Sequence, residues 1–295
     1  MPQEEQRNQK VTRLTYVAPA KLNRFLSVMG KRSDGFHILE LITTVLHDWQ
    51  SLTDELTVEV AQETSLEIDG PASEGLQPDE SNLVVRAWRA LENESGRALP
   101  AKIKLFKRIP HGAGLGGGSS DAAAALRAGN NLYNLGLPDS VLLRIAAGSG
   151  SDVPLFLLGG TVFGFDLGQR VIPMQTITLP PILIVFPHIH VSTQAVYKAV
   201  TPQDYSSPTP CPGLGRGEAP PWRNDLTTAA LRVCPALQHV RDAILEVGGD
   251  PLLCGSGSSW AARFTSIADR DTGLKKLTSQ HPEWSFYTED GTSAS

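Results

Sequence analysis

Apolar and polar residues alternate over short runs along the N-terminal half of the chain. Residues 56–60 and 101–106 place apolar side chains at every second position, which is typical of half-buried β-strands. Other short apolar runs, bounded by turn-forming residues, predict further strands. They are residues 14–18, 25–29, 38–46, 153–158, 161–165 and 182–186. Residues 63–79 are rich in glycine, proline and acidic residues, and we expect a surface loop there.

Helical periodicity appears between these runs. Leu83, Val84, Ala87, Trp88 and Leu91 fall on one stripe behind Ser81 or Asn82, either of which can cap a helix. Further helices are expected over residues 119–132, 139–147, 193–200, 225–233 and 236–247. Strands and helices do not alternate strictly, which favours an α+β fold over a doubly wound parallel sheet. The proline-rich segment 202–221 is interpreted as an irregular loop.

Composition narrows the class of protein. The chain has 295 residues, 41 % hydrophobic and 19 % charged, with a net charge of -5. This mildly acidic balance lacks the positive patch that nucleic acids or anionic membranes attract. No apolar run reaches the roughly 18–20 residues of a membrane span, and the polar N-terminus does not resemble a signal peptide. We therefore expect a cytoplasmic protein that binds neither nucleic acid nor membrane.

The three cysteines lie far apart in the sequence and show no C-x-x-C pairing. They are Cys211, Cys234 and Cys254. This pattern argues against a disulfide framework and against a structural zinc site.

The most informative segment is the glycine-rich stretch 110–121, which has five glycines between Gly112 and Gly118. Glycines let the backbone approach a ligand closely. The alanine-rich helix that follows aims its unpaired amides back at the loop. Together these features predict an anion site suited to phosphate. Ser119 and Ser120 can cap the helix or donate to a phosphate oxygen.

Two common phosphate motifs do not fit this loop. A Walker A loop needs a lysine near its end, and none is present. A dinucleotide fingerprint needs an acidic residue about 20 positions further on, at the end of a strand, and the chain has none there. A merely flexible glycine linker is the alternative, but linkers are rarely followed at once by a strong helix.

The loop resembles the phosphate loop of the GHMP kinases, a family named after galactokinase, homoserine kinase, mevalonate kinase and phosphomevalonate kinase. Three more segments resemble that family in the same order. They are residues 19–26 (PAKLNRFL), 32–37 (RSDGFH) and 150–156 (GSDVPLF). Residues 255–258 (GSGS), preceded by 224–226 (NDL), resemble its third motif. The loop sequence GLGGGSSDAA (residues 114–123) is similar to that of one branch of the family. The acceptor substrate of that branch is a methylerythritol unit that carries cytidine diphosphate.

This resemblance implies a two-domain α+β fold with the active site in the cleft between the domains. The boundary is expected near residue 170, which gives an ATP-binding domain over 1–170 and a second domain over 171–295. It implies that Asp152 contacts the acceptor hydroxyl as catalytic base or orienting group. Lys21 is expected beside it, keeping the carboxylate ionised. The simpler alternatives are that Asp152 caps a turn before Pro154 and that Lys21 is a surface lysine.

The resemblance also implies the ligand contacts. Asn23, Phe36 and His37 are expected to bind the acceptor with Asp152, with His37 facing the cytosine edge and Phe36 packing on the base. The ATP contacts are expected to be Pro110, Gly112, Gly114, Leu115, Gly116, Gly117, Gly118, Ser119 and Ser120. ATP should bring Mg²⁺, held mostly by phosphates and water, so no protein metal ligand is assigned. A monomer or weak homodimer is expected.

The sequence departs from the family pattern at three places, and three alternative functions remain open. Phe36 stands where the family branch usually has tyrosine, Cys254 where it often has threonine, and the 202–221 loop matches no motif. The chain could instead phosphorylate homoserine or mevalonate, be a catalytically silent nucleotide-binding relative, or be a decarboxylase of the same fold. Retention of both Lys21 and Asp152 argues against the silent relative.

Overall fold

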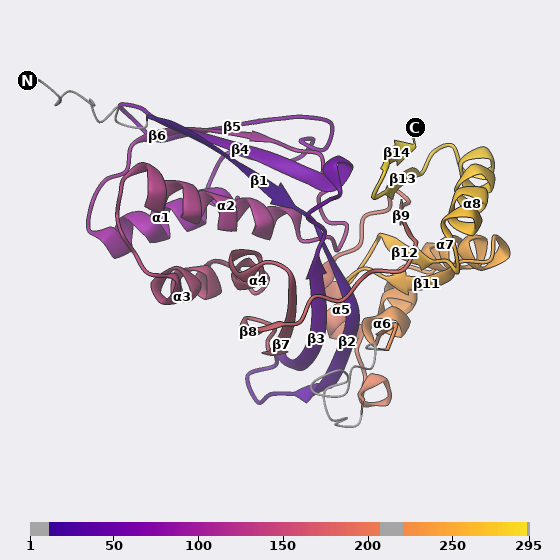
Figure 1. Ribbon diagram of the computed structural model, residues 1–295. Coiled ribbons are helices and arrows are strands. Elements are labelled where there is room, and N and C mark those ends of the chain that lie inside the picture. The colour runs from indigo at the N-terminus through magenta and orange to yellow at the C-terminus, as the bar shows by residue number, and fades with distance from the viewer. Residues whose placement is uncertain (1–11, 207–220, 294–295) are drawn as a thin grey trace, which may run out of the picture.

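The computed structural model describes residues 12–206 and 221–293, which form helices packed on three β-sheets (Figure 1). Most of the segment interpreted as an irregular loop, residues 207–220, lies outside the described residues. Its first residues form a short 3-10 turn, η2 (Pro202–Asp204). The prediction of an α+β fold is confirmed.

The first sheet has the strand order β1-β4-β6-β5 and is covered on one face by helices (Figure 1). Its strands are β1 (Arg13–Pro19), β4 (Thr53–Val60), β5 (Ser65–Asp69) and β6 (Ala101–Phe106). The helices are α1 (Leu83–Ser95), α2 (Gly117–Leu132), α3 (Asp139–Ser149) and α4 (Val153–Leu158). Helix α2 packs on β1 and β4, and its fully buried Ala122, Ala125 and Ala128 let it approach the strands closely.

The second sheet, β10-β2-β3-β7-β8, forms the centre of the molecule, and the third sheet, β11-β12-β9-β13-β14, lies in the C-terminal half (Figure 1). The strands of the second are β2 (Lys21–Lys31), β3 (His37–Val45), β7 (Thr161–Asp166), β8 (Arg170–Met174) and β10 (Arg223–Asn224). Those of the third are β9 (Ile182–Phe186), β11 (Asp250–Leu253), β12 (Trp260–Arg263), β13 (Ser285–Thr288) and β14 (Gly291–Ser293). The remaining helical elements are η1 (Gln50–Leu52), α5 (Thr193–Ala199), α6 (Leu226–Val233), α7 (Ala236–Glu246) and α8 (Ile267–Gln280).

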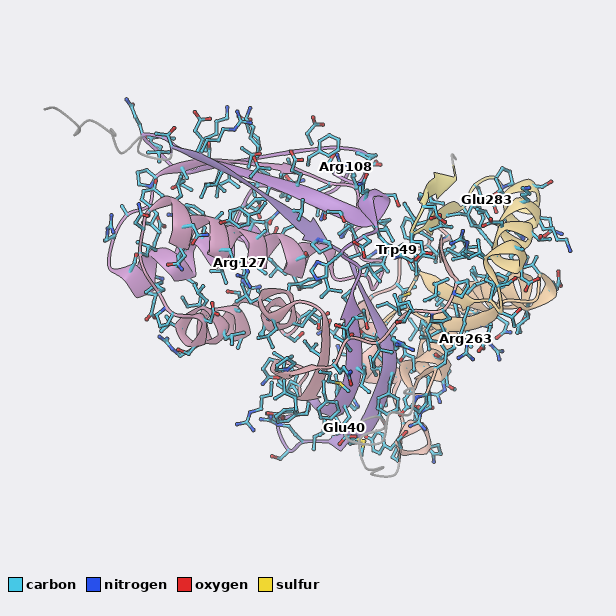
Figure 2. All side chains as sticks on the ribbon, viewed as in Figure 1. Glu40, Trp49, Arg108, Arg127, Arg263 and Glu283 are labelled. Atoms are coloured by element: carbon cyan, nitrogen blue, oxygen red, sulfur yellow. The ribbon has the colours of Figure 1, made fainter. Side chains whose placement is uncertain are left out.

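The two halves of the chain are packed together through shared apolar cores. Leu26 and Leu41 of the β2–β3 ribbon belong to one core with Leu226 and Trp260 of the C-terminal half. A second shared core surrounds Trp49, which lies where the first sheet meets the C-terminal half (Figure 2). Strand β10, from the C-terminal half, pairs in parallel with β2, so one sheet contains strands from both sides of residue 170. The division of the chain into two domains near that residue stays a prediction.

Two predicted elements were wrong. Residues 153–158, expected as a strand, form helix α4. A short apolar run has no decisive periodicity, and Pro154 is tolerated because it lies in the first helical turn. The expected loop 63–79 contains strand β5, which pairs in parallel with β6. Leu66 and Ile68 of this strand pack against the apolar core between the first sheet and its helices. The glycines and acidic residues around them hid this short strand in the sequence.

The start of helix α2 also differs from the expectation. The helix begins at Gly117, with Gly116 as its N-cap at φ 75°, and no side chain caps it. Ser119 and Ser120 therefore lie inside the first turn and do not cap it. Because no side chain occupies the cap, the amides of that turn remain available to an anion. By contrast, α1 has its predicted cap, since the Asn82 side chain accepts from the amide of Val84 at 3.0 Å.

Candidate active site

The glycine-rich loop is held against two distant segments of the chain. The amide of Lys21 donates to the carbonyl of Leu115 at 2.9 Å, and the amide of Ser259 donates to that of Ala113 at 3.3 Å. Gly114 has φ +78°, and a Cβ there would lie 1.8 Å from the carbonyl oxygen of Cys254. A side chain at this position cannot be accommodated without moving one of the two loops.

A cavity of about 410 Å³ opens beside this loop. Gly112, Gly114, Gly116, Gly117, Gly118 and Ser119 line it together with Pro110 and the N-terminus of α1 at Asn82 and Leu83. The first turn of α2 therefore faces a space that extends beyond the size of a phosphate group. Ser120 does not line this cavity; it is buried and faces a different cavity with Phe156 and Arg127.

Lys21 begins strand β2, two residues after the first sheet's strand β1 ends at Pro19. Its side chain is buried, with an exposed fraction of 4 %. Its Nζ donates to Oδ1 of Asn23 at 2.9 Å, and the same oxygen accepts from Oγ1 of Thr43 at 3.1 Å. These two donors fix the Asn23 amide with its oxygen toward Lys21, which leaves Nδ2 as a donor to a ligand.

Asp152 lies immediately before helix α4. Its Oδ2 is 3.4 Å from Nζ of Lys21, and 29 % of its side chain is exposed. The side chain makes no capping hydrogen bond to the helix, so the turn-capping alternative is wrong. Lys21 is buried and paired, so the surface-lysine alternative is wrong as well. The pair presents a carboxylate to solvent with an ammonium behind it.

A second cavity of about 180 Å³ contains this pair. Lys21, Asn23 and Asp152 line it together with Thr193, Tyr197, Gly255 and Ser256 of the C-terminal half. Gly114, Gly116 and Thr193 line both this cavity and the one beside the glycine loop. The two cavities therefore adjoin at the loop, and a group transferred between them would pass over Gly114 and Gly116.

Gly255 and Ser256 of the third motif line the Asp152 cavity where it meets the loop. The Nδ2 of Asn224 donates to the carbonyls of Leu253 at 2.8 Å and Gly255 at 2.6 Å, so segments 224–226 and 255–258 are in contact. Thr193 and Ser256 share a hydrogen bond of 2.8 Å between their hydroxyls. These bonds join the three segments of the C-terminal half that contain Thr193, Asn224 and Gly255 to one another.

An aromatic group lies near the Asp152 cavity. The ring of His37 is 5.6 Å from that of Tyr197 and 6.3 Å from that of Tyr205. His37 is buried, whereas Phe36 is 60 % exposed and can meet a ligand from solvent. Burial, and to a smaller extent the charge of Lys31, lowers the pKa of His37. The imidazole is therefore neutral at neutral pH and offers one donor and one acceptor.

Several residues of the site were not predicted from the sequence, among them Thr193, Tyr197 and Tyr205. A lone tyrosine on a short amphipathic helix gives the same pattern as a core residue, so no local signal marks Tyr197. Burial, and next the negative charge of Asp152, raises the pKa of Tyr197, so its phenol stays neutral. Only the folded chain brings it to the Asp152 cavity.

Across residues 12–206 and 221–293 we find no cluster of three or more histidine, cysteine or acidic side chains that could hold a metal ion. In the same ranges, no helix has the length and apolar character needed to cross a membrane.

The chain matches a kinase family model and curated relatives that are kinases. Residues 82–160 match the family model of the GHMP kinases N terminal domain. The 4-diphosphocytidyl-2-C-methyl-D-erythritol kinase of Paramagnetospirillum magneticum is 34 % identical over 284 residues, which cover 93 % of this chain and 97 % of that protein. The Thermus thermophilus kinase of the same name is 39 % identical, over 83 % of this chain and 85 % of its own.

Solved structures agree with the sequence matches. A crystal structure of 4-(cytidine 5'-diphospho)-2C-methyl-D-erythritol kinase superposes with a TM-score of 0.72 at 34 % identity, covering 93 % of this chain and 98 % of that one. Homoserine kinase from Cytophaga hutchinsonii superposes with a TM-score of 0.65 at 17 % identity, over 99 % and 98 % of the two chains. At that identity the second match concerns the fold alone.

Proposed function

Because the chain belongs to the GHMP kinases and, among them, to the 4-diphosphocytidyl-2-C-methyl-D-erythritol kinases, we propose that it phosphorylates a hydroxyl of that cytidine-bearing compound with ATP. The products are the 2-phosphate and ADP, and the reaction belongs to the non-mevalonate route to isoprenoid precursors. The observation that carries the proposal is the junction of the two cavities. It places an anion-binding loop next to a carboxylate within reach of a second ligand.

ATP is assigned to the larger cavity. Its phosphates would lie along the glycines and the uncapped first turn of α2, where backbone amides and the helix dipole favour negative charge. The rest of the cavity, toward Asn82 and Leu83, leaves room for the nucleoside. Of the predicted loop contacts, Ser119 faces this cavity, whereas Ser120 supports the loop from its other side.

The acceptor is assigned to the Asp152 cavity. Its hydroxyl would donate to Asp152 and attack the γ-phosphorus, while the bond from that phosphorus to the oxygen bridging it to the β-phosphate breaks and ADP leaves. Asp152 takes the hydroxyl proton. Lys21 donates to Asn23 and forms an ion pair with Asp152, and its remaining N–H groups can stabilise the charge that develops on the transferred group.

The cytidine end is assigned to the aromatic group. Phe36 and Tyr197 provide ring faces for a base, and the neutral His37 can pair with the polar edge of cytosine. The side chain at position 36 lacks a phenolic hydroxyl, so stacking is the contact that remains to it. This arrangement supports selection of a cytidine-bearing acceptor over homoserine or mevalonate.

Mg²⁺ is proposed to enter with ATP. The donor set fits an ion held chiefly by phosphate oxygens and water, with the Ser119 hydroxyl as a hard oxygen ligand on the protein. Bound there, the ion would neutralise part of the charge on the β- and γ-phosphates.

The test is ATP consumption by the purified protein with Mg²⁺ and 4-diphosphocytidyl-2-C-methyl-D-erythritol, with mevalonate and homoserine as parallel acceptors. Asp152→Ala is assayed beside the wild type. Turnover with the cytidine compound alone, lost in the variant, supports the proposal. Turnover with a control acceptor overturns the substrate assignment, and ATP binding without turnover on any acceptor overturns the activity.

A further inference from the structure

Three charged side chains lie beneath the phosphate loop and take no part in the reaction described above. Asp54, Lys107 and Asp121 are 0 %, 2 % and 2 % exposed. The Nζ of Lys107 donates to Oδ2 of Asp54 and, at 2.6 Å, to Oδ2 of Asp121. Burying charged groups is costly unless they are paired, so this cluster needs a reason in the fold or in function.

The cluster connects the segments on both sides of the loop. Asp54, on β4, accepts through Oδ1 from the amides of Arg108 at 2.5 Å and Ile109 at 2.9 Å, just before the loop. Asp121 lies on α2, just after it. The ammonium between them is 3.2 Å from the position that a Cβ on Gly117 would occupy. One ammonium thus fixes the entry and the exit of the loop relative to each other.

The charges of the cluster do not balance if both acids are ionised, because one ammonium faces two carboxylates. Asp54 uses both of its oxygens as acceptors. The Oδ1 of Asp121 is buried and has no hydrogen-bond partner among the described residues. An unpaired, buried carboxylate oxygen is costly, whereas a proton on Asp121 removes the excess charge.

We propose that Asp54, Lys107 and Asp121 are positioning residues for the phosphate loop, and that Asp121 acts as a protonated acid so that the cluster presents no net charge to the triphosphate. This inference rests on the proposed function only in taking ATP as the ligand of the larger cavity. Burial, together with the charge of Asp54, outweighs the attraction of Lys107 and raises the pKa of Asp121 to about 8.

The consequence concerns nucleotide binding. Lys107, His111 and Asp121 are the titratable side chains among the described residues that line this cavity, and Asp54 lies behind them. Loss of the Asp121 proton leaves a net negative charge beside the triphosphate, and like charges in a poorly hydrated site repel strongly. ATP should therefore bind more weakly as the pH rises through about 8.

The experiment measures the dissociation constant of ATP from pH 6.5 to 9.5 by displacement of a fluorescent ATP analogue, without acceptor. In the wild type the constant should rise above about pH 8, by up to about tenfold per pH unit for one required proton. In Asp121→Asn, whose amide has no titratable proton, the constant should stay flat over this range. The exposed control Asp139→Asn should follow the wild-type curve, and the ionisation of ATP itself affects all three proteins equally.

A second measurement decides the protonation state directly. The infrared difference spectrum of wild type minus Asp121→Asn at pH 7 should contain the carbonyl stretch of a protonated carboxylic acid. Absence of that band overturns the proposal, as does an Asp121→Asn curve that rises in parallel with the wild type. If the wild type does not bind ATP at any pH, the proposed kinase function fails, while the infrared band still decides whether Asp121 carries the proton.

Discussion

The Nζ of Lys21 lies 3.4 Å from Oδ2 of Asp152, and the two side chains differ in exposure, at 4 % and 29 %. The carboxylate therefore faces the cavity and the ammonium supports it from behind. A pair of this kind adds little to stability, because one partner is partly solvated. The pair does hold a carboxylate at a defined place beside the cavity.

Asp152→Asn keeps the shape of this side chain and removes its charge. We expect kcat to fall by about 10²–10⁴-fold, the usual contribution of a positioned acid or base, while the KM for ATP stays within about twofold, since Asp152 does not line the ATP cavity. Steady-state kinetics with both substrates checks this. Asp48→Asn, at an exposed turn, is the control. Wild-type kcat in Asp152→Asn would show that the carboxylate is dispensable.

Gly114→Ala tests the contact between the loop and the third motif. Gly114 and Gly136 have similar backbone angles, φ +78° and +66°, but a Cβ on Gly114 would overlap the Cys254 carbonyl, whereas at Gly136 it meets open space. Gly136→Ala should cost about 1–2 kcal/mol of stability from the left-handed backbone alone and leave ATP binding intact. Gly114→Ala should cost more and abolish detectable ATP binding. Thermal unfolding and ATP titration of both variants measure this, and equal losses in the two would contradict the contact.

His37→Ala should affect the acceptor and spare ATP. Loss of the pairing edge beside Tyr197 is expected to raise the KM for the cytidine-bearing acceptor by about 10–100-fold, the scale of one lost base contact of about 1–3 kcal/mol. The KM for ATP should not change. Tyr197→Phe, which keeps the ring, is the matched control for Tyr197→Ala and should stay near wild type. An effect on ATP that equals the effect on the acceptor would remove His37 from the acceptor site.

The same histidine predicts a pH dependence. Its pKa is lowered from 6.5 by burial, so the imidazole is neutral at neutral pH and becomes protonated only below that value. Acceptor KM should therefore stay flat from pH 8 down to 6.5 and rise only at lower pH, as the acceptor nitrogen is lost. A rise that already occurs above pH 6.5 would contradict the buried, neutral state.

Cys254 should resist thiol reagents. It is fully buried next to the loop, and burial, only partly offset by the charge of Lys21, raises the pKa of its thiol to about 12. The reactive species is the thiolate, so at pH 8 the native protein should be alkylated at the half-buried Cys234 and not at Cys254. Peptide mass spectrometry after alkylation with and without denaturant reads this out. Rapid labelling of Cys254 in the native protein would show that the loop junction opens.

The sequence by itself determined the elements that carry local signals. The glycine run before an alanine-rich stretch predicted a loop that leads directly into a helix, because backbone conformation and helix amides are properties of neighbouring residues. The structure has this loop and the uncapped start of the helix beside a cavity. The period-two runs at 56–60 and 101–106 and the capped stripe after Asn82 likewise predicted β4, β6 and α1. Where the local signal is ambiguous, as in the apolar run 153–158, the prediction was wrong and a helix forms.

Only the tertiary structure decided which distant residues meet. The position of Tyr197 near His37 and the Asp54–Lys107–Asp121 cluster each join side chains that are far apart along the chain. The pairing of Lys21 with Asp152 was expected from the family resemblance alone, and the structure confirms it. No local pattern marks such partners, since a buried lysine or a tyrosine on a helix looks the same in sequence whatever it contacts. Burial and charge at these sites arise from packing of the three sheets, and they set the protonation states on which the proposed chemistry depends.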